Sequence, residues 1–222
     1  ALRCIKQNWP QINTIGGNRQ WMLARAPELA FPDGLRGEAL QPLVSLDGSD
    51  SLSLDDVVSL LYHSGRSLPH ALMMLVPEPW EQLKYIDPDL RAFYDFHAGM
   101  MEQWDGPAAL AFSDGVRAGA TLDRNGLRPL RYAITADGLF IAGSEAGTVI
   151  VDQSEIVEKG RLGPGQMIVV DTERGEVLHN PEIKHEVAAQ SPYGEWLARR
   201  RVSLPGSLEL PAASEVEQIA AV

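Results

Sequence analysis

The chain has 222 residues, of which 45% are hydrophobic and 22% are charged, and its formal net charge is −11 at pH 7. This composition is typical of a globular protein with a sizeable core, and the negative charge disfavours binding to nucleic acid or to anionic membranes. The one cysteine, Cys4, excludes an internal disulfide framework and a cysteine-based metal cluster, and no apolar stretch approaches the ~18 residues of a membrane-spanning helix. We therefore expect a cytoplasmic protein that binds neither nucleic acid nor a membrane.

The five histidines are scattered along the chain and lack zinc-ligand spacing, so the sequence predicts no metal site. Each is expected to be a surface side chain or a hydrogen-bonded core side chain. They are His63, His70, His97, His179 and His185.

Residues 52–104 have a helical pattern in three segments. In the first, Ser53 is the expected N-cap of a run with apolar residues at helical spacing, which ends before Gly65. The second begins near Pro69, where the missing N–H is tolerated in the first turn. The third corresponds to "PDLRAFYDFHAGMM" (88–101), with acids near its start.

Residues 107–178 are predicted to form short strands. The runs are "PAALAFS", "VRAGATL", "RPLRYAIT", "GLFIAGS" and "QMIVVDT". They are separated by the turn pairs Asp114-Gly115, Asn125-Gly126, Asp137-Gly138 and Arg174-Gly175. Such pairs favour antiparallel connections.

Three further segments are predicted around these strands. "GRLGPGQ" (160–166) is expected to loop before the last strand, and residues 181–200 are expected to form a closing helix that begins at Pro181. From Ser203 the chain is rich in Pro, Ser and Glu, which predicts a tail or a linker.

Helices followed by antiparallel strands predict an α+β fold in which helices cover a sheet. Two sheets packed between layers of helices are consistent with this pattern, and so is a single covered sheet. The pattern does not distinguish the two.

Asp50 lies between Ser49 and Ser51 in "DGSDSLSLDD", just before a helical run. One interpretation is a capping group whose oxygens accept from free N–H groups of the helix. The other is a carboxylate at the mouth of a pocket, which could hold a cation such as the α-ammonium of an amino acid. Capping is the commoner role of such a residue.

"GATLDRNGLRPLRY" predicts a hairpin with an Asn-Gly turn and three arginines, Arg124, Arg128 and Arg131. We expect these arginines to be solvated. The sequence shows no Ser/His/Asp arrangement and no phosphate-binding glycine loop, because "GRLGPGQ" has a proline where a backbone donor is needed. The residues alone thus specify no reaction.

Five long blocks give a more specific indication: "GSDS", "LLYHSGRSLPHALMMLVPEPW", "DPDLRAFYDFHAGMMEQWDGPAALAFSDG", "GATLDRNGLRPLRY" and "EKGRLGPGQMIVVDT". In this order and spacing they closely resemble the class II glutamine amidotransferase domain of the glutamate synthase large subunit, from about Ile12 to at least Lys184. The resemblance implies an N-terminal nucleophile (Ntn) hydrolase fold, an αββα sandwich, incomplete at its N-terminus. Residues 1–202 would be the C-terminal part of that domain, and 203–222 a linker or tail.

The resemblance also implies a reaction. Such domains hydrolyse L-glutamine to glutamate and ammonia, and the ammonia reacts with 2-oxoglutarate in a distant synthase domain. The family nucleophile is a cysteine at the first residue, whose free α-amine is the general base, and an Asn side chain and a Gly N–H in a His-Asn-Gly-Glu segment form the oxyanion hole.

Several residues of this chain match family positions. Asp50 takes the role of binding the glutamine α-ammonium, with Ser49 and Ser51 beside it. Asn13 and Thr14, together with Gly17, Asn18 and Trp21, match the stretch after the oxyanion motif and are expected to shape the floor of the pocket. Asn125 and Gly126 match a family hairpin with a role in structure or at the interface with the synthase region.

The chain departs from the family at the reactive groups. Cys4 is neither the first residue nor followed by Gly, and "QNWPQINT" (7–14) stands where the family has His-Asn-Gly-Glu-Ile-Asn-Thr. Asn8 is the remaining oxyanion candidate, but Trp9 or Pro10 occupies the position of the Gly N–H, and Pro has no N–H. We therefore expect no glutaminase activity from this chain alone.

Two hypotheses remain open. The chain is part of a glutaminase domain of glutamate synthase, or it is a degenerate, non-catalytic module that binds an amino acid or a synthase partner. In the first, the partners are L-glutamine, the remaining synthase domains and a small reductase subunit. No cofactor is expected here, because the FMN and iron–sulfur sites of the family lie outside these residues. The isolated chain is expected to be poorly stable, since sheet edges would be uncovered.

Overall fold

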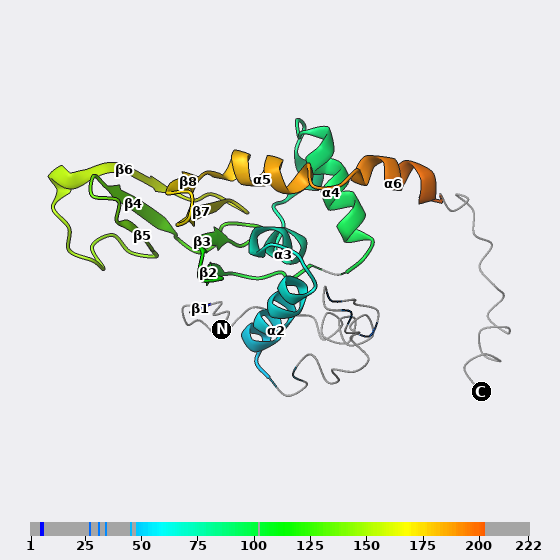
Figure 1. Ribbon diagram of the computed structural model, residues 1–222, viewed down its shortest axis with the longest axis horizontal. Coiled ribbons are helices and arrows are strands. Elements are labelled where there is room, and N and C mark those ends of the chain that lie inside the picture. The colour runs from blue at the N-terminus through cyan, green and yellow to red at the C-terminus, as the bar shows by residue number, and fades with distance from the viewer. Residues whose placement is uncertain are drawn as a thin grey trace.

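The computed structural model describes residues 5–6, 27, 31, 34, 45, 48–101 and 103–202. Within these ranges the chain has a mixed α+β fold with two antiparallel sheets (Figure 1). One sheet has five strands in the order β1-β2-β3-β7-β8, and the other has three in the order β5-β4-β6. The prediction of an α+β fold is confirmed, and the described residues favour its two-sheet version.

The helices fall in two parts of the sequence, before and after the strands. They are α2 (Asp50–His63), α3 (Leu68–Leu75), α4 (Pro88–Ala98), α5 (Asn180–Ala188) and α6 (Tyr193–Arg200), with short 3₁₀ turns at Trp80–Gln82 and Gln153–Glu155. The strands are β1 (Ile5–Lys6), β2 (Ala109–Ser113), β3 (Arg117–Leu122), β4 (Arg131–Thr135), β5 (Phe140–Gly143), β6 (Ile156–Arg161), β7 (Met167–Asp171) and β8 (Glu176–Leu178).

Helix α2 begins one turn earlier than the sequence predicts. Its N-cap is Ser49, whose hydroxyl accepts a hydrogen bond from the Leu52 N–H at 3.2 Å. The predicted cap, Ser53, is instead a buried residue inside the helix. The prediction was wrong because two serines at suitable spacing precede the apolar run, and only the fold determines which one lies outside the helix.

Helices α3 and α4 confirm their predictions. Ser67 caps α3 by accepting from the His70 N–H, and Pro69 lies in its first turn. Asp87 caps α4 by accepting from the Leu90 N–H at 3.2 Å, and Pro88 starts the helix. Local capping chemistry and proline positions are enough to define both starts.

The Asn125-Gly126 turn does not close the predicted hairpin. It connects β3 of the five-stranded sheet to β4 of the three-stranded sheet, and these strands do not pair. Gly126 has φ +63°, and a Cβ added there would lie 2.9 Å from the Pro164 ring. The pairs at Asp114-Gly115, Asp137-Gly138 and Arg174-Gly175 do join antiparallel neighbours, as predicted.

Two other elements differ from the sequence prediction. Strand β6 was not predicted, because only Ile156 and Val157 of its six residues are apolar. The single closing helix at 181–200 is two helices, α5 and α6, separated at 189–192 by a segment that contains Pro192. The tail predicted from Ser203 lies outside the described residues.

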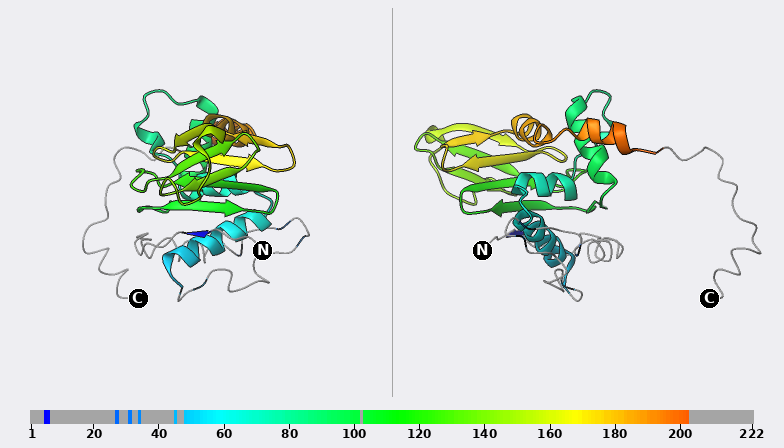
Figure 2. Two further views of the ribbon diagram at one scale, coloured as in Figure 1. Left: turned by 90° about the vertical axis from the view of Figure 1, so that its left-hand side faces the viewer. Right: turned by 45° about the vertical axis from the view of Figure 1, so that its right-hand side comes forward.

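The five-stranded sheet has a different apolar core on each face. Leu110, Phe112 and Val169 point to the helices and belong to the larger core. Ala120, Leu122 and Ile168 point the other way, toward Tyr132 and Phe140 of the three-stranded sheet. The described residues therefore form helix, sheet and sheet layers. In Figures 1 and 2, β4–β6 lie at one end of the molecule and α4 and α6 at the other.

Phe112 packs across the sheet onto Gly119, its partner on β3. A Cβ at Gly119 would lie 2.5 Å from the phenyl ring and 2.7 Å from the Ile168 carbonyl oxygen. Glycine is therefore required at this position of the strand by the close approach of an aromatic ring.

Candidate functional site

The N-terminus of α2 carries the acid that the sequence singles out. Ser49 performs the capping, and Asp50 is the first residue of the helix, half-buried, in the turn where the helix dipole favours a carboxylate. Ser51 follows it and is also half-buried. Ser49 thus caps the helix, and the neighbouring Asp50 provides the carboxylate.

The segment before α2 folds back onto the helix. The Ser45 N–H donates to the Asp56 carboxylate at 2.9 Å. A Cβ at Gly48 would lie 2.8 Å from a methyl of Leu52, so the chain passes close to the first turn there. This packing fixes the direction in which Ser49 and Asp50 enter the helix.

The other predicted site residues, Asn8, Asn13 and Thr14, lie outside the described residues. The same holds for Cys4 and for the side chains around them. Their placement relative to Asp50 stays a prediction.

A buried aspartate, Asp123, organises the corner where the chain passes between the sheets. Its carboxylate accepts hydrogen bonds from the backbone N–H groups of Ala108 (3.1 Å), Asn125 (2.9 Å) and Leu127 (3.2 Å). Its carbonyl accepts from the N–H of Gly165 at 2.8 Å. The sequence reading overlooked Asp123, although aspartate at the start of a turn is a known signature of this arrangement.

The arginine beside this corner is paired rather than solvated. Arg124 contacts the Glu81 carboxylate at 2.7 Å and the Gln103 amide oxygen at 2.9 Å. The prediction of solvated arginines is therefore wrong for Arg124, because its partners come from distant parts of the chain. Arg131 is exposed.

A second buried charge lies between α4 and α5. Lys184 Nζ is 2.8 Å from the Glu78 carboxylate, which also accepts from the Tyr94 hydroxyl at 3.1 Å. Burial lowers the pKa of Lys184, and Glu78 opposes that shift. Burial also raises the pKa of Tyr94, and Glu78 adds to it. The group joins two helices to the loop before Trp80.

Two buried histidines join α3 to α4. The Nε2 atoms of His70 and His97 are 3.3 Å apart, His97 Nδ1 donates to the Phe93 carbonyl at 2.8 Å, and His70 Nδ1 is 3.3 Å from the Gln190 amide. Burial is the main reason that the pKa of His70 falls to about 4 and that of His97 to about 3. Both are neutral near pH 7, as expected of hydrogen-bonded core histidines.

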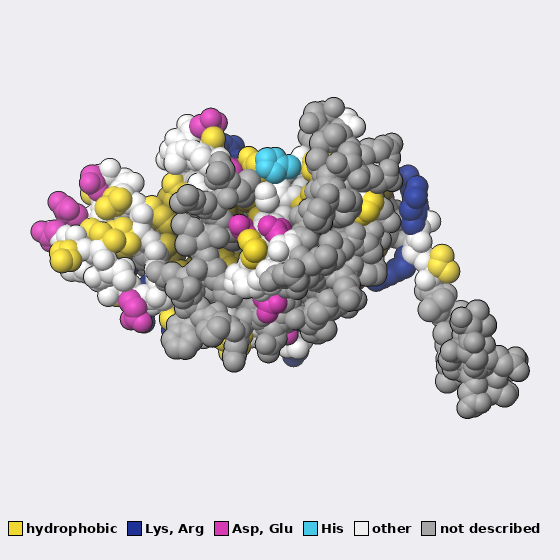
Figure 3. All heavy atoms as spheres, turned by 90° about the horizontal axis from the view of Figure 1, so that it is seen from below, with side chains coloured by type: hydrophobic (Ala, Val, Ile, Leu, Met, Phe, Trp, Pro, Cys, Tyr) yellow, Lys and Arg dark blue, Asp and Glu magenta, His cyan; other side chains and the backbone are white. Residues whose placement is uncertain are grey.

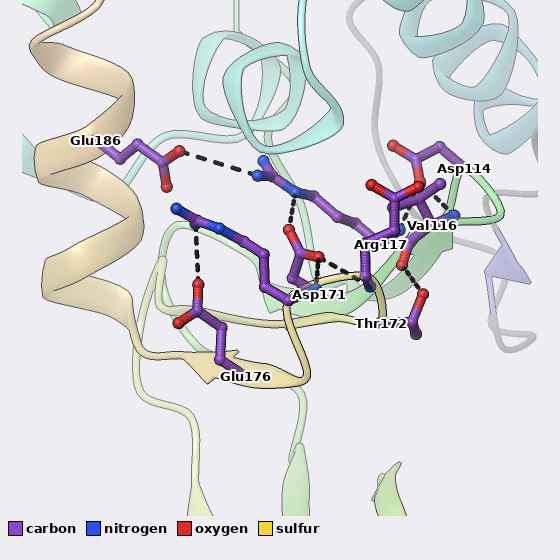
Figure 4. Close-up of polar contacts among 9 residues, drawn as sticks. Asp114, Val116, Arg117, Asp171, Thr172, Glu176 and Glu186 are labelled. Atoms are coloured by element: carbon purple, nitrogen blue, oxygen red, sulfur yellow. Dashed lines mark hydrogen bonds and ion pairs between the residues drawn. The ribbon is translucent and has the colours of Figure 1, made fainter.

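Arg117 ties β3 to β7 and to α5 (Figure 4). Its guanidinium is 2.8 Å from the Asp171 carboxylate and 3.9 Å from the Glu186 carboxylate. Hydrogen bonds from the Arg174 backbone and from Arg117 lower the pKa of Asp171. We interpret this network as structural, since it closes the end of the sheet.

Within the described ranges, no three His, Cys, Asp or Glu side chains are grouped as a metal site would require. None of the helices in those ranges combines the length and the apolar character needed to cross a bilayer.

Comparison with known proteins identifies the family. A model of the class II glutamine amidotransferases matches residues 1–196. The chain belongs to this family. The resemblance noted in the sequence is thereby confirmed.

Three relatives are glutamate synthases. The chain is 42% identical over 211 residues to the glutamate synthase [NADPH] large chain of Bacillus subtilis, covering 94% of this chain and 14% of that protein. It is 47% identical over 201 residues to the ferredoxin-dependent glutamate synthase of Cyanidium caldarium, covering 89% and 13%. It is 45% identical over 216 residues to the chloroplastic ferredoxin-dependent enzyme of Oryza sativa, covering 94% and 13%.

The chain therefore spans about 14% of the length of the Bacillus relative. Because the rice relative is named as chloroplastic, family membership does not determine the compartment, and the cytoplasm stays a prediction. The two electron donors in the relatives' names, NADPH and ferredoxin, likewise belong to those proteins.

Proposed function

We propose that this chain is the C-terminal part of the glutamine-hydrolysing domain of a glutamate synthase. The observation that carries the proposal is the family match over residues 1–196, together with relatives that are all named glutamate synthases. The fold we propose is the Ntn αββα sandwich, and the two antiparallel sheets with helices on one side support it. The ammonia released would react with 2-oxoglutarate in the synthase region.

Within this function, Asp50 binds the α-ammonium group of L-glutamine. A carboxylate in the first turn of a helix is stabilised in its charged form, and a charged carboxylate accepts strong hydrogen bonds from an ammonium. Because Ser49 performs the capping, the Asp50 carboxylate is not required to cap α2. Ser49 and Ser51 flank it, while Asn13 and Thr14 shape the floor of the pocket.

We further propose that these 222 residues by themselves do not hydrolyse glutamine. Attack on an amide requires an activated nucleophile and donors for the oxyanion. The single cysteine, Cys4, is followed by Ile5, and Trp9 or Pro10 occupies the place of the oxyanion glycine. Asn8 alone would supply one donor of the two.

Calorimetric titration of the full chain with L-glutamine tests the role of Asp50. We expect binding to be lost in Asp50→Asn, which removes the charge at constant size. Asp89→Asn is the matched control, because Asp89 is also an acid in the first turn of a helix. Equal binding by both variants would show that Asp50 does not hold the substrate.

An ammonia-release assay tests the second claim. We expect no release from the wild-type chain. Release that disappears in Asp50→Asn would show that the chain is a glutaminase and would overturn the claim of inactivity.

The runner-up function is a non-catalytic module that binds an amino acid or a synthase partner. Trp9 and Pro10 favour it, since they replace a reactive motif without altering the family sequence that follows. Glutamine binding with no turnover, by a polypeptide that also carries the family's N-terminal cysteine segment, would support this alternative.

The cofactors of the proposed parent enzyme, FMN and an iron–sulfur cluster, are assigned to regions outside these residues. One cysteine cannot supply the thiolates that such a cluster needs. The partners we propose are L-glutamine, the remaining synthase domains and a small reductase subunit.

A further inference from the structure

The three-stranded sheet forms the floor of a groove that the proposed function does not use. The groove has a volume of about 710 Å³ and lies between the outer face of β4, β5 and β6 and the loop 144–152. This volume falls within the range of small-molecule sites, roughly 300–1,000 Å³. The opposite face of the same sheet is the one that packs on the five-stranded sheet through Tyr132 and Phe140.

Three cationic side chains lie on the floor of the groove. Arg131 on β4 is directly opposite Arg161 on β6, and Lys159 is two residues away on the same face. Residues opposite each other on neighbouring antiparallel strands have Cβ atoms about 5 Å apart, and like charges there are destabilising. Both guanidinium groups can therefore reach a single anionic group above the sheet.

These three cations lack the acidic partners that most other cations in the described part of the chain have. None of the three has an ion pair or a side-chain hydrogen bond with another described residue. In contrast, six cations elsewhere have acidic partners: Arg117–Asp171, Arg124–Glu81, Arg174–Glu176, Lys184–Glu78, Arg199–Glu195 and Arg201–Asp95. In a chain with net charge −11, acids to pair them are plentiful, so a group of unpaired cations in a concave site indicates an anionic ligand.

The walls of the groove are partly apolar, and Glu145, Thr148 and Gln153 also line it. Ile141 contributes from β5, and Val149 and Ile150 from the loop. Val149 is 48% exposed and Ile150 is 97% exposed, so both are available to cover a flat apolar group. An inorganic anion would contact only the cationic floor, whereas a ligand with an anionic group and an apolar group would contact both the floor and the walls.

We propose that this groove binds a small phosphate-bearing molecule with a planar apolar body, of the nucleoside diphosphate class. Two arginines bind phosphate oxygens in a bidentate manner, and a lysine adds a third positive charge, which matches a diphosphate better than a single carboxylate. The apolar body lies against Val149 and Ile150. The site is separate from Asp50 and does not depend on glutamine hydrolysis.

The test is calorimetric titration of the full chain with ADP, pyrophosphate and adenosine. We expect ADP to bind, pyrophosphate to bind about 10-fold more weakly because it lacks the apolar contact, and adenosine not to bind. In the double variant Arg131→Gln/Arg161→Gln, ADP binding should weaken at least about 10-fold, the effect of losing one charged hydrogen bond.

The matched control is Arg199→Gln/Arg200→Gln, which removes the same charge from α6. ADP should bind this variant, and Asp50→Asn, as tightly as it binds wild type. Without ligand, the groove variant should melt at the wild-type temperature or above, because a like-charge pair has been removed. This also excludes misfolding as the cause of lost binding.

Four results would overturn the proposal: no binding of ADP, equal weakening in both double variants, binding of adenosine as tight as that of ADP, or binding of poly-L-glutamate in place of ADP. The last would indicate an acidic protein partner. Loss of ADP binding in Asp50→Asn would place the ligand in the glutamine site and would also contradict a separate groove.

Discussion

At the scale of single residues, one of the most hydrogen-bonded side chains in the described part of the chain has no proposed chemistry. Asp123 is 1% exposed and accepts from three backbone N–H groups, of which the bond to the Ala108 N–H is buried. Asp50, in contrast, leaves the capping of its helix to a neighbour. Asp123 therefore has a structural role without a proposed chemical one, whereas Asp50 has a proposed chemical role and does not cap its helix.

Replacing Asp123 should therefore cost stability. Asp123→Ala leaves the buried Ala108 N–H without a partner and removes the bonds that hold the turn at Asn125 and Leu127. It should lower the free energy of unfolding by about 2 kcal/mol, measured by urea denaturation. Asp114→Ala is the control, because Asp114 accepts two backbone N–H groups in an exposed turn and should cost about 1 kcal/mol or less. Equal losses in the two variants would show that Asp123 contributes no more to the free energy of unfolding than an aspartate in an exposed turn.

The histidine pair should make stability depend on pH. Because burial holds the pKa of His70 at about 4 and that of His97 at about 3, the unfolded chain takes up protons first, near pH 6.5. The stability that the two neutral histidines allow is complete above that pH and is lost as the pH falls toward 4, by on the order of 6 kcal/mol for the two together.

Denaturation midpoints at pH 7 and pH 5 measure this loss. We expect a smaller pH dependence in His70→Gln/His97→Gln than in wild type. His185→Gln is the control, because His185 is exposed. An unchanged pH dependence in the double variant would show that the pair does not titrate in this way.

The candidate site could be predicted from the sequence only in part. Asp50 and its flanking serines are proposed from a short motif and a family resemblance, and their role stays a prediction. The Lys184–Glu78 pair, the His70–His97 pair and the cations of the groove were not predicted, because each joins residues far apart in sequence. No local spacing encodes such contacts.

At the scale of elements, local sequence patterns predicted the starts of helices and the positions of turns better than they predicted which strands pair. The prolines that mark the starts of α3 and α4 lie within a few residues of each start, and the prediction of both helices succeeded. The Asn125-Gly126 turn was correctly found, but the choice of sheet for the next strand is made by distant residues such as Gly165 and Ala108. Strand β6 was missed for a similar reason, since its burial alternates and depends on β4.

The corrected start of α2 leads to a test. Ser49→Ala should lower the free energy of unfolding by about 1 kcal/mol, and Ser49→Asp should retain most of the stability, because aspartate is also a good N-cap. Urea denaturation measures both. Similar losses in the two variants would show that the hydroxyl of Ser49 is not acting as the cap.

At the scale of the whole molecule, the two ends have different surfaces. Seen from below, the lobe with β4, β5 and β6 shows hydrophobic and acidic side chains, and the largest group of Lys and Arg side chains lies at the other end, where α6 ends (Figure 3). Val157 is 67% exposed on β6, which is an edge strand. An exposed apolar side chain on an edge strand favours association between chains.

We therefore expect the chain to associate as its concentration rises, and Val157→Lys to reduce this association in light scattering, because lysine protects edge strands. Val202→Lys is the control, since Val202 is 83% exposed but lies outside the strands. Equal effects of the two changes would indicate that net charge, rather than the strand edge, controls association.

The corner at Asp123 also determines where this sequence can vary. Gly126 lies against Pro164, and Gly165 lies so close to Glu78 that an added Cβ would be 2.4 Å from its Cα. An added methyl group at either glycine would therefore have to move the backbone of Pro164 or of Glu78. In the loop 144–152, an added Cβ at Gly147 would meet nothing within 4 Å, so only the backbone conformation there, with φ +86°, favours glycine. New binding properties can therefore arise at the tip of the lobe while its base stays fixed.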